Sequence, residues 1–256
     1  MTPVNFAQYV KRLDSVLAEK LFFLSQIDLD DKVVIDFGCG DGSMLQEIEH
    51  VYPNAKLVGI DQEPKMLNLA RRKVPKAEFY SGLDEFKANQ SKYVGQPTVV
   101  IFSSVLHELY NDYHLYHVIP SAEEIPNYFL SFCDYVIVRD MYVEECYSPL
   151  LPEDICKILQ KANPQQLAEF IHVYGSNFVH FLLKYNYTEN WYNELMEDYA
   201  SVPWHCFLNS ERHNVVYDHI YVQNWRRNLV MKDFGIDLKR VTLGTHRAMI
   251  LESKEK

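Results

Sequence analysis

The 256-residue sequence lacks the features of a secreted, disulfide-stabilised or membrane-spanning protein. Its five cysteines are scattered, odd in number and form no C-x-x-C pair, which favours a reducing cytosol over a disulfide framework. No apolar run approaches the roughly 20 residues that a membrane span needs. Charged residues interrupt the first 20 positions, so we predict no signal peptide. We therefore expect a cytoplasmic protein with no membrane partner.

Several catalytic signatures are also absent. The sequence contains no G-x-S-x-G elbow and no Walker loop, which argues against hydrolase and NTPase functions. His114 and His117 stand three positions apart, yet no third and fourth ligand accompanies them at metal-binding spacing. We therefore expect no metal site.

Basic residues are too few for a protein that binds polyanions non-specifically. There are 25 against 35 acidic residues, for a net charge of −10. The segment 221–247 differs, because six bases there face two acids. A solvated surface is the more frequent reason for such a segment, and a phosphate-binding patch for RNA stays open as the alternative. The charge balance favours a small-molecule substrate.

Three of the nine glycines lie in one run, V-V-I-D-F-G-C-G-D-G-S at 33–43. The apolar residues at its start predict a buried parallel strand, and Gly38, Gly40 and Gly42 predict a turn into a helix. Glycine permits conformations that a Cβ would forbid and lets a ligand approach the backbone. Free N–H groups at the start of the next helix attract a carboxylate or phosphate. The strand is therefore expected to end at a ligand-binding loop.

The spacing of these glycines distinguishes the loop from a dinucleotide-binding one. A dinucleotide fingerprint reads G-x-G-x-x-G, whereas this loop reads G-x-G-x-G and is preceded by Asp36. It resembles motif I of the class I S-adenosylmethionine (SAM) dependent methyltransferases. A second strand at 56–60 ends at Asp61, where a doubly wound fold binds a ribose hydroxyl pair. The resemblance implies that Asp61 binds the ribose of SAM.

Two later segments extend the resemblance over roughly residues 30 to 140. A strand at 77–80 leads into S-G-L-D, which flanks adenine in the resembled family, and a strand at 98–102 leads into S-S-V-L-H-E-L at 103–109. The second run resembles the family's motif beside the methyl group. The resemblance implies SAM as cofactor and S-adenosylhomocysteine as product. The implied cofactor-binding residues are Asp36, Gly38, Cys39, Gly40, Asp61, Gln62, Gly82, Leu83 and Ser103.

The remaining pattern predicts an α/β fold. Helical segments at 44–51, 64–73 and 121–133 alternate with the strands, and a fifth strand is expected at 135–138, which implies right-handed parallel crossovers. We predict the last two strands at 238–243 and 246–252, as a hairpin. The expected fold, matching the resembled family, is a doubly wound, mostly parallel seven-stranded sheet with a helical insertion between strands five and six.

We divide the chain into four parts. These are an N-terminal helical cap (1–30), a SAM-binding Rossmann-like core (31–145), a helical insertion (146–230) and C-terminal strands that complete the sheet (231–256). The insertion is rich in aromatic residues, and it would lie over the edge where doubly wound folds bind ligands. We therefore expect it to recognise the substrate.

Two histidines are the catalytic candidates. His107 follows the fourth strand, where the resembled family places groups near the substrate. Its neighbour Glu108 is not expected to pair with it, since adjacent side chains on a helix diverge. His246, in the last hairpin, is the second candidate. A base is needed only if the acceptor must lose a proton.

The sequence thus predicts transfer of a methyl group from SAM to a nucleophilic oxygen or nitrogen of an unidentified acceptor, a small polar or aromatic molecule. The run F-S-S-V-L-H-E-L differs from the N/D-P-P-Y/F motif of amino methyltransferases acting on adenine and cytosine, so that chemistry loses support. RNA methylation through the segment 221–247 is one alternative. A non-catalytic SAM-binding sensor or partner protein is the other.

Overall fold

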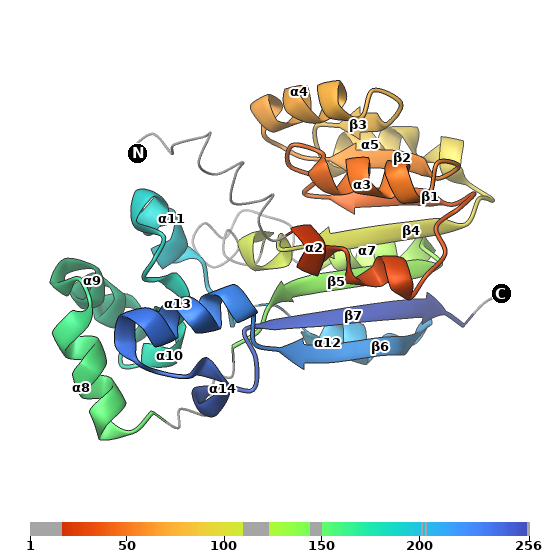
Figure 1. Ribbon diagram of the computed structural model, residues 1–256. Helices are drawn as coiled ribbons and strands as arrows, with labels where there is room; N and C mark the ends of the chain where they lie inside the picture. Colours follow the sequence, from red (N-terminus) through yellow and green to blue (C-terminus); the bar gives the residue numbers. More distant parts are fainter. Residues whose placement is uncertain (1–16, 110–122, 144–149, 201, 203, 255–256) are drawn as a thin grey trace.

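A computed structural model describes residues 17–109, 123–143, 150–200, 202 and 204–254. Its sheet has seven strands in the order β3-β2-β1-β4-β5-β7-β6, and β1 to β5 run parallel to one another (Figure 1). β7 runs antiparallel to both β5 and β6. The predicted fold class is therefore confirmed. The strands are β1 (Val33–Phe37), β2 (Lys56–Ile60), β3 (Glu78–Tyr80), β4 (Thr98–Ser103), β5 (Tyr135–Met141), β6 (His213–Tyr221) and β7 (His246–Ser253).

Helices cover both faces of the sheet. One face carries α2 (Leu17–Lys20) with the 3-10 turn Phe22–Ser25, and also α3 (Ser43–Val51) and α4 (Pro64–Lys73). The other face carries α5 (Leu83–Asn89), α7 (Glu124–Phe132) and α12 (Trp204–Leu208). A 3-10 turn at Gln90–Tyr93 follows α5. Because both faces are covered, every residue of β1 and of β4 is buried, as expected for central parallel strands.

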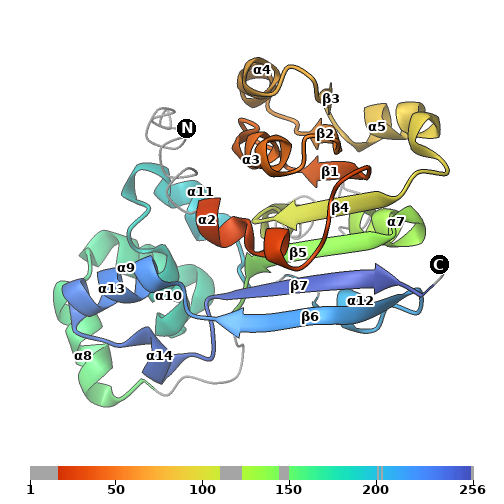
Figure 2. The same cartoon turned by 45° about the vertical axis from the view of Figure 1, so that its right-hand side comes forward.

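A second group of helices lies beyond the carboxyl ends of β4 and β5 (Figure 2). These helices share a separate hydrophobic core, which we call the helical half. It is built from two stretches of chain, one between β5 and β6 and one between β6 and β7. Its helices are α8 (Pro152–Lys161), α9 (Pro164–Tyr174), α10 (Phe178–Lys184), α11 (Trp191–Met196), α13 (Asn224–Phe234) and α14 (Leu238–Val241), with a 3-10 turn at Thr188–Asn190.

The strand predicted at 238–243 is wrong. Residues 238–241 form helix α14, whose first turn is capped by the Asp237 side chain, which accepts a hydrogen bond from the Lys239 N–H. The strand beside β7 is instead β6, inside the range 146–230 that we predicted to be helical. β6 is an edge strand with mostly exposed or half-buried residues, so it carries no strong alternation of apolar and polar residues that would reveal it.

The predicted N-terminal helix lies mostly outside the described residues. Its described end forms α2 and the following 3-10 turn. Among the described residues, no helix combines the length and the apolar character that crossing a bilayer requires. His114 and His117 also lie outside the described part.

Candidate active site

The glycine loop connects β1 to α3 at the carboxyl edge of the sheet. Gly38, Gly40 and Gly42 have φ angles of 78°, 53° and 79°. A Cβ on Gly38 would lie 2.6 Å from Val105 Cγ2, and one on Gly42 would lie 3.0 Å from the backbone of Ala70. Two positions of the loop thus need glycine for both conformation and space.

Asp61 joins this loop to the end of β2. Its Oδ2 accepts a hydrogen bond from the Gly40 N–H at 2.8 Å, and its Oδ1 accepts one from the Glu63 N–H at 2.8 Å. A carboxylate has about four acceptor positions. Asp61, which is half-buried, therefore retains acceptor positions for ligand hydroxyls.

Asp36 lies near the end of β1 with 1% of its surface exposed, and within the described part of the chain neither carboxylate oxygen has a hydrogen-bond partner. Burial raises its pKa to about 7, with a contribution from Asp61 and against the opposing charge of Lys20. Ser103, at the end of β4, has a buried hydroxyl that is also unpartnered. A buried carboxylate without a partner costs free energy that a cation would recover. The ammonium of an amino-acid ligand fits this position.

The other predicted cofactor residues lie along the same edge. Cys39 is buried within the loop, and burial raises the pKa of its thiol, so it is an unreactive packing residue. Gln62 follows β2 and is exposed. Gly82 and Leu83 begin α5 just beyond β3, and a Cβ on Gly82 would meet no atom within 4 Å. The tips of β1 to β4 thus bring all nine residues to one edge.

His107 forms a pair with Asp140 of β5. His107 Nδ1 lies 2.5 Å from Asp140 Oδ1, and the imidazole is 4% exposed. Asp140 Oδ2 accepts hydrogen bonds from the backbone N–H groups of Val105 and Leu106, at 3.1 and 2.7 Å. Asp140 therefore fixes both the histidine ring and the segment after β4.

The second ring nitrogen of His107 faces the helical half. Nε2 lies 3.7 Å from Glu197 Oε2, and the ring packs edge-on against Tyr199 at 5.5 Å. Burial disfavours the imidazolium, but the carboxylates of Asp140 and Glu197 outweigh it and raise the pKa of His107 to about 9. As predicted, Glu108 is not the partner, and its side chain is exposed.

A buried lysine holds the segment that carries Glu197. Lys184 Nζ donates hydrogen bonds to the backbone carbonyls of Glu194 and Glu197, and it lies 3.9 Å from the centre of the Tyr199 ring. Burial, with the charge of Glu194, raises the pKa of Glu197, and His107 opposes that shift. The helical half therefore contributes a carboxylate to the candidate active site.

Sequence reasoning missed Asp140 and Glu197. Asp140 had a usable signal, since it ends a parallel strand at the same edge as His107. Glu197 had none, because it follows α11 in a region with no motif.

His246 begins β7 and is 2% exposed. Its Nδ1 lies 2.9 Å from Thr245 Oγ1, and its ring stacks on Tyr221 with centroids 5.7 Å apart. Burial, with the positive charges of Arg139 and Arg226, holds the pKa of His246 well below its usual range. The two predicted histidines therefore differ in charge at neutral pH, with His107 cationic and His246 neutral.

The segment 221–247 does not present its bases as one free patch. Arg226 is 1% exposed and donates to the Leu183 carbonyl. The other arginines form ion pairs, namely Arg227 with Asp237, Arg240 with Asp154 and Arg247 with Asp218. RNA binding through this segment has no support.

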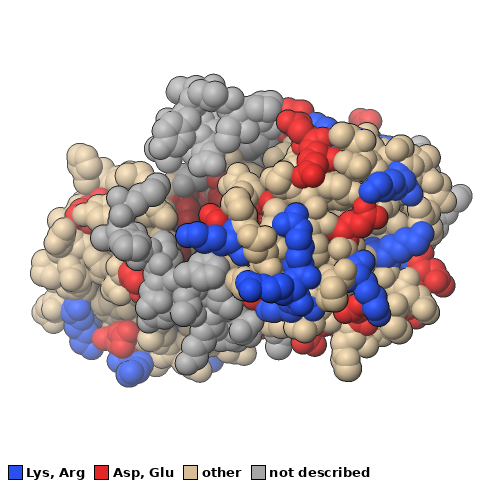
Figure 3. All heavy atoms as spheres, turned by 90° about the horizontal axis from the view of Figure 1, so that it is seen from above, with Lys and Arg blue, Asp and Glu red and all other residues tan. Residues whose placement is uncertain are grey.

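On a different face, seen from the side of α4, basic side chains gather with acidic ones among and beside them (Figure 3).

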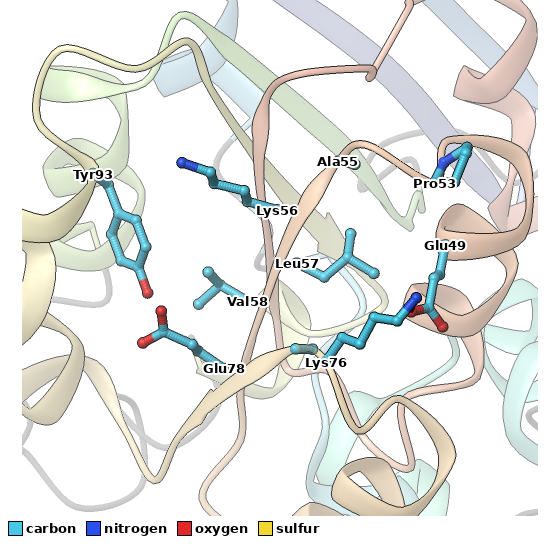
Figure 4. A pocket seen from close by; sticks show the side chains of 10 residues that line it. Glu49, Pro53, Ala55, Lys56, Leu57, Val58, Lys76, Glu78 and Tyr93 are labelled. Carbon is cyan, nitrogen blue, oxygen red and sulfur yellow. The ribbon is translucent and has the colours of Figure 1, made fainter.

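A small pocket lies at the opposite edge of the sheet. Its lining includes Lys56, which begins β2, Glu78, which begins β3, and Tyr93 (Figure 4). Ligands of doubly wound sheets bind outside the carboxyl ends of the strands. We therefore assign the site to the other edge.

Comparison with known proteins shows the family to which the chain belongs. Residues 28–170 match a family model described as "Methyltransferase domain". A "Trans-aconitate 2-methyltransferase" of Afipia carboxidovorans is 31% identical over 121 residues, which is 46% of this chain and 44% of that protein. The protein of the same name from Azoarcus sp. is 34% identical over 73 residues, 28% of this chain and 29% of that protein. The chain thus spans less than half the length of these relatives.

Among solved structures, the plantazolicin methyltransferase BamL, crystallised with a triazolic desmethylPZN analog and SAH, has a similar fold. The alignment covers 98% of this chain and 90% of that chain, with a TM-score of 0.53 and 13% sequence identity. At this identity the likeness supports the fold alone.

Proposed function

Because the chain belongs to the methyltransferase-domain family, we propose that it is a class I SAM-dependent methyltransferase that methylates an oxygen or nitrogen of a small polar or aromatic molecule. SAM supplies the methyl group as an electrophile on its sulfonium. The chain's own residues bind the cofactor, exclude water and control the acceptor's proton. Much of the catalysis then comes from orientation and desolvation.

The carboxyl edge of β1 to β4 forms the proposed cofactor site. Asp61 would accept hydrogen bonds from the ribose hydroxyls, and the Gly38–Gly42 loop would lie against the amino-acid end. Asp36 would face the ammonium, because its buried carboxylate has no hydrogen-bond partner among the residues that the structure describes. Gln62, Gly82 and Leu83 would border the adenine. No metal is assigned a role.

The pair of His107 and Asp140 is the observation that carries the proposed chemistry. Asp140 engages Nδ1, so Nε2 is the nitrogen that exchanges a proton with the acceptor. Since the pKa of His107 is raised to about 9, only its neutral fraction accepts a proton at neutral pH. Turnover should therefore increase with pH up to about 9. We assign His246, a neutral imidazole at the same edge, to the acceptor side.

We propose that the helical insertion (146–230) recognises the acceptor. Glu197 reaches His107 from this part of the chain, and Lys184 holds it there. Trans-aconitate belongs among the compounds to be tested, because relatives carry that name.

The test incubates the protein with methyl-labelled SAM and fractionated small-molecule extract, and follows label in the products by mass spectrometry. His107→Ala should lower turnover by about 10²- to 10⁴-fold, the usual contribution of a general base, and should leave affinity for S-adenosylhomocysteine unchanged. His172→Ala, an exposed histidine on α9, is the matched control. Label found only in macromolecules would contradict the proposed substrate class, and unchanged turnover in His107→Ala would remove His107 from the mechanism.

A further inference from the structure

Arg139 is a buried guanidinium with one open donor nitrogen. It lies near the end of β5 with 2% of its surface exposed. Nε donates to the Tyr221 hydroxyl at 3.0 Å, and Nη1 donates to Ser104 Oγ at 2.7 Å. Nη2 has no hydrogen-bond partner among the described residues. Two contacts therefore hold the group in place and leave its third nitrogen available.

The nearest carboxylate only partly compensates this charge. Glu19 Oε2 lies 3.6 Å from Arg139 Nη2, and the same oxygen accepts a hydrogen bond from Gln223 Nε2 at 2.8 Å. Leaving a buried guanidinium nitrogen unpaired costs free energy, which an anionic oxygen at hydrogen-bond distance would recover.

Lys20 adds a second positive charge at this position. It is the last residue of α2 and follows Glu19 directly. Within the described part of the chain it has no ion pair. Burial, together with the positive charge of Arg139, lowers its pKa to about 8, so it is still mostly charged at neutral pH. Within the described residues, Arg139 forms an ion pair only with Glu19, whereas the buried carboxylates of Asp36 and Asp140 act on Lys20 from beyond ion-pair distance.

The sheet places this cationic group on the acceptor side of the proposed cofactor site. Side chains two residues apart on a strand share a face, so Asp36, Ser103 and Arg139 lie on the face covered by α2. The register sets Arg139 level with Ser103, and β4 separates β5 from β1. Two strand spacings put Arg139 about 10 Å from the end of β1.

A surface groove leads to this group. Its lining includes Glu19 and Tyr221, which both contact Arg139, and also Phe22, Tyr217 and His219. Phe22 stacks on Tyr217 at 5.4 Å and His219 stacks on Tyr221 at 5.7 Å, so aromatic rings form much of its wall. Arg139 is not itself a lining residue, and it lies directly behind Glu19 and Tyr221.

We propose that Arg139, assisted by Lys20, binds a carboxylate of the acceptor, so that the substrate is an organic acid. This inference rests on the proposed function, since it assigns the β5 side of the edge to the acceptor. The acceptor's carboxylate would accept a hydrogen bond from Arg139 Nη2, and Glu19 would still accept its hydrogen bond from Gln223. The orphaned Asp36 accepts a cation at one end of the site, and Arg139 accepts an anion at the other.

The experiment measures ligand binding to the protein saturated with S-adenosylhomocysteine. The probes are acid and neutral pairs, benzoate with benzamide and trans-aconitate with its trimethyl ester, at constant ionic strength. We expect at least one acid, and neither neutral compound, to bind and to raise the melting temperature. Arg139→Met should weaken that binding at least tenfold and Lys20→Met several-fold. Arg227→Gln, which removes a half-buried guanidinium paired with Asp237, should leave it unchanged.

Two further measurements identify the source of the carboxylate and protect the test against misfolding. If Arg139→Met weakens S-adenosylhomocysteine but not 5′-methylthioadenosine, which lacks the amino-acid end, the site holds the cofactor's carboxylate and the proposal is overturned. Equal binding of acids and neutral analogues, or of neither, also overturns it. Should Arg139→Met fail to fold, Lys20→Met decides, because the Lys20 side chain makes no hydrogen bond to the described residues and its loss should not unfold the protein. Methyl transfer from labelled SAM is measured separately. Failure of the carboxylate site can therefore be distinguished from failure of the proposed methyltransferase function.

Discussion

The residues at the two ends of the carboxyl edge differ in how far apart they lie in the sequence. At the β1–β2 end, Asp36, Gly40 and Asp61 come from one stretch of 26 residues, and a single hydrogen bond joins the loop to Asp61. At the β4–β5 end, His107, Asp140 and Glu197 come from three elements, one of them in the helical half. The first end is thus encoded by a local motif, and the second is assembled by folding.

The two ends also differ in what they lack. The β1 end holds a buried carboxylate without a partner, and the β5 end holds a buried guanidinium with an open donor. A ligand with a cationic and an anionic group, or two ligands with one each, would satisfy both. The difference predicts that cofactor and acceptor affinities respond to separate sets of substitutions.

The largest expected effect on ligand affinity concerns the local end. Asp61→Ala removes a carboxylate that accepts hydrogen bonds from Gly40 and Glu63 and that we assign to the ribose. Hydrogen bonds to charged groups contribute about 1.5–3 kcal/mol each, so affinity for S-adenosylhomocysteine should fall about 10- to 150-fold. Calorimetry measures this, with Glu63→Gln as control. Retained affinity would mean that Asp61 only closes the loop.

Asp36 should make cofactor binding depend on pH. Because its pKa is raised to about 7, the carboxyl is largely protonated in the free protein below that pH. An ammonium favours the ionised form, so binding should release a proton, and affinity for S-adenosylhomocysteine should weaken by up to about tenfold per pH unit below 7. Calorimetry in buffers of different ionisation enthalpy counts the proton. Asp36→Asn should abolish the release, and an equal release in both proteins would show that another group titrates.

The smallest effect tests the link between the two halves. Glu197→Gln removes one of the carboxylates that raise the pKa of His107, while Asp140 remains. His107 then becomes neutral at lower pH, and the rising limb of kcat/KM should move from about 9 by less than about one pH unit toward acid. Glu153→Gln, an exposed carboxylate on α8, is the control. If the rising limb of the pH profile does not move, Glu197 of the helical half does not influence the protonation of His107.

Elements with a complete local signal were predictable from the sequence. Helix α4 runs over Pro64–Lys73, as predicted, because proline suits the first turn and Glu63 caps it. The strand predicted at 238–243 failed, because the loosely alternating run L-K-R-V-T-L is overridden by a cap at Asp237 and by packing in the helical half. β6 escaped prediction because an edge strand buries little of either face.

The amino-acid sequence by itself determined the glycine loop, the acid beyond β2 and the parallel core, because short-range sterics and periodic burial specify them. Only the tertiary structure decided that His107 pairs with Asp140, that Glu197 approaches it, and that Arg139 keeps one donor open. These relations depend on which strand ends become neighbours. Strand order and the docking of the helical half set those neighbours, through contacts between residues far apart in the chain.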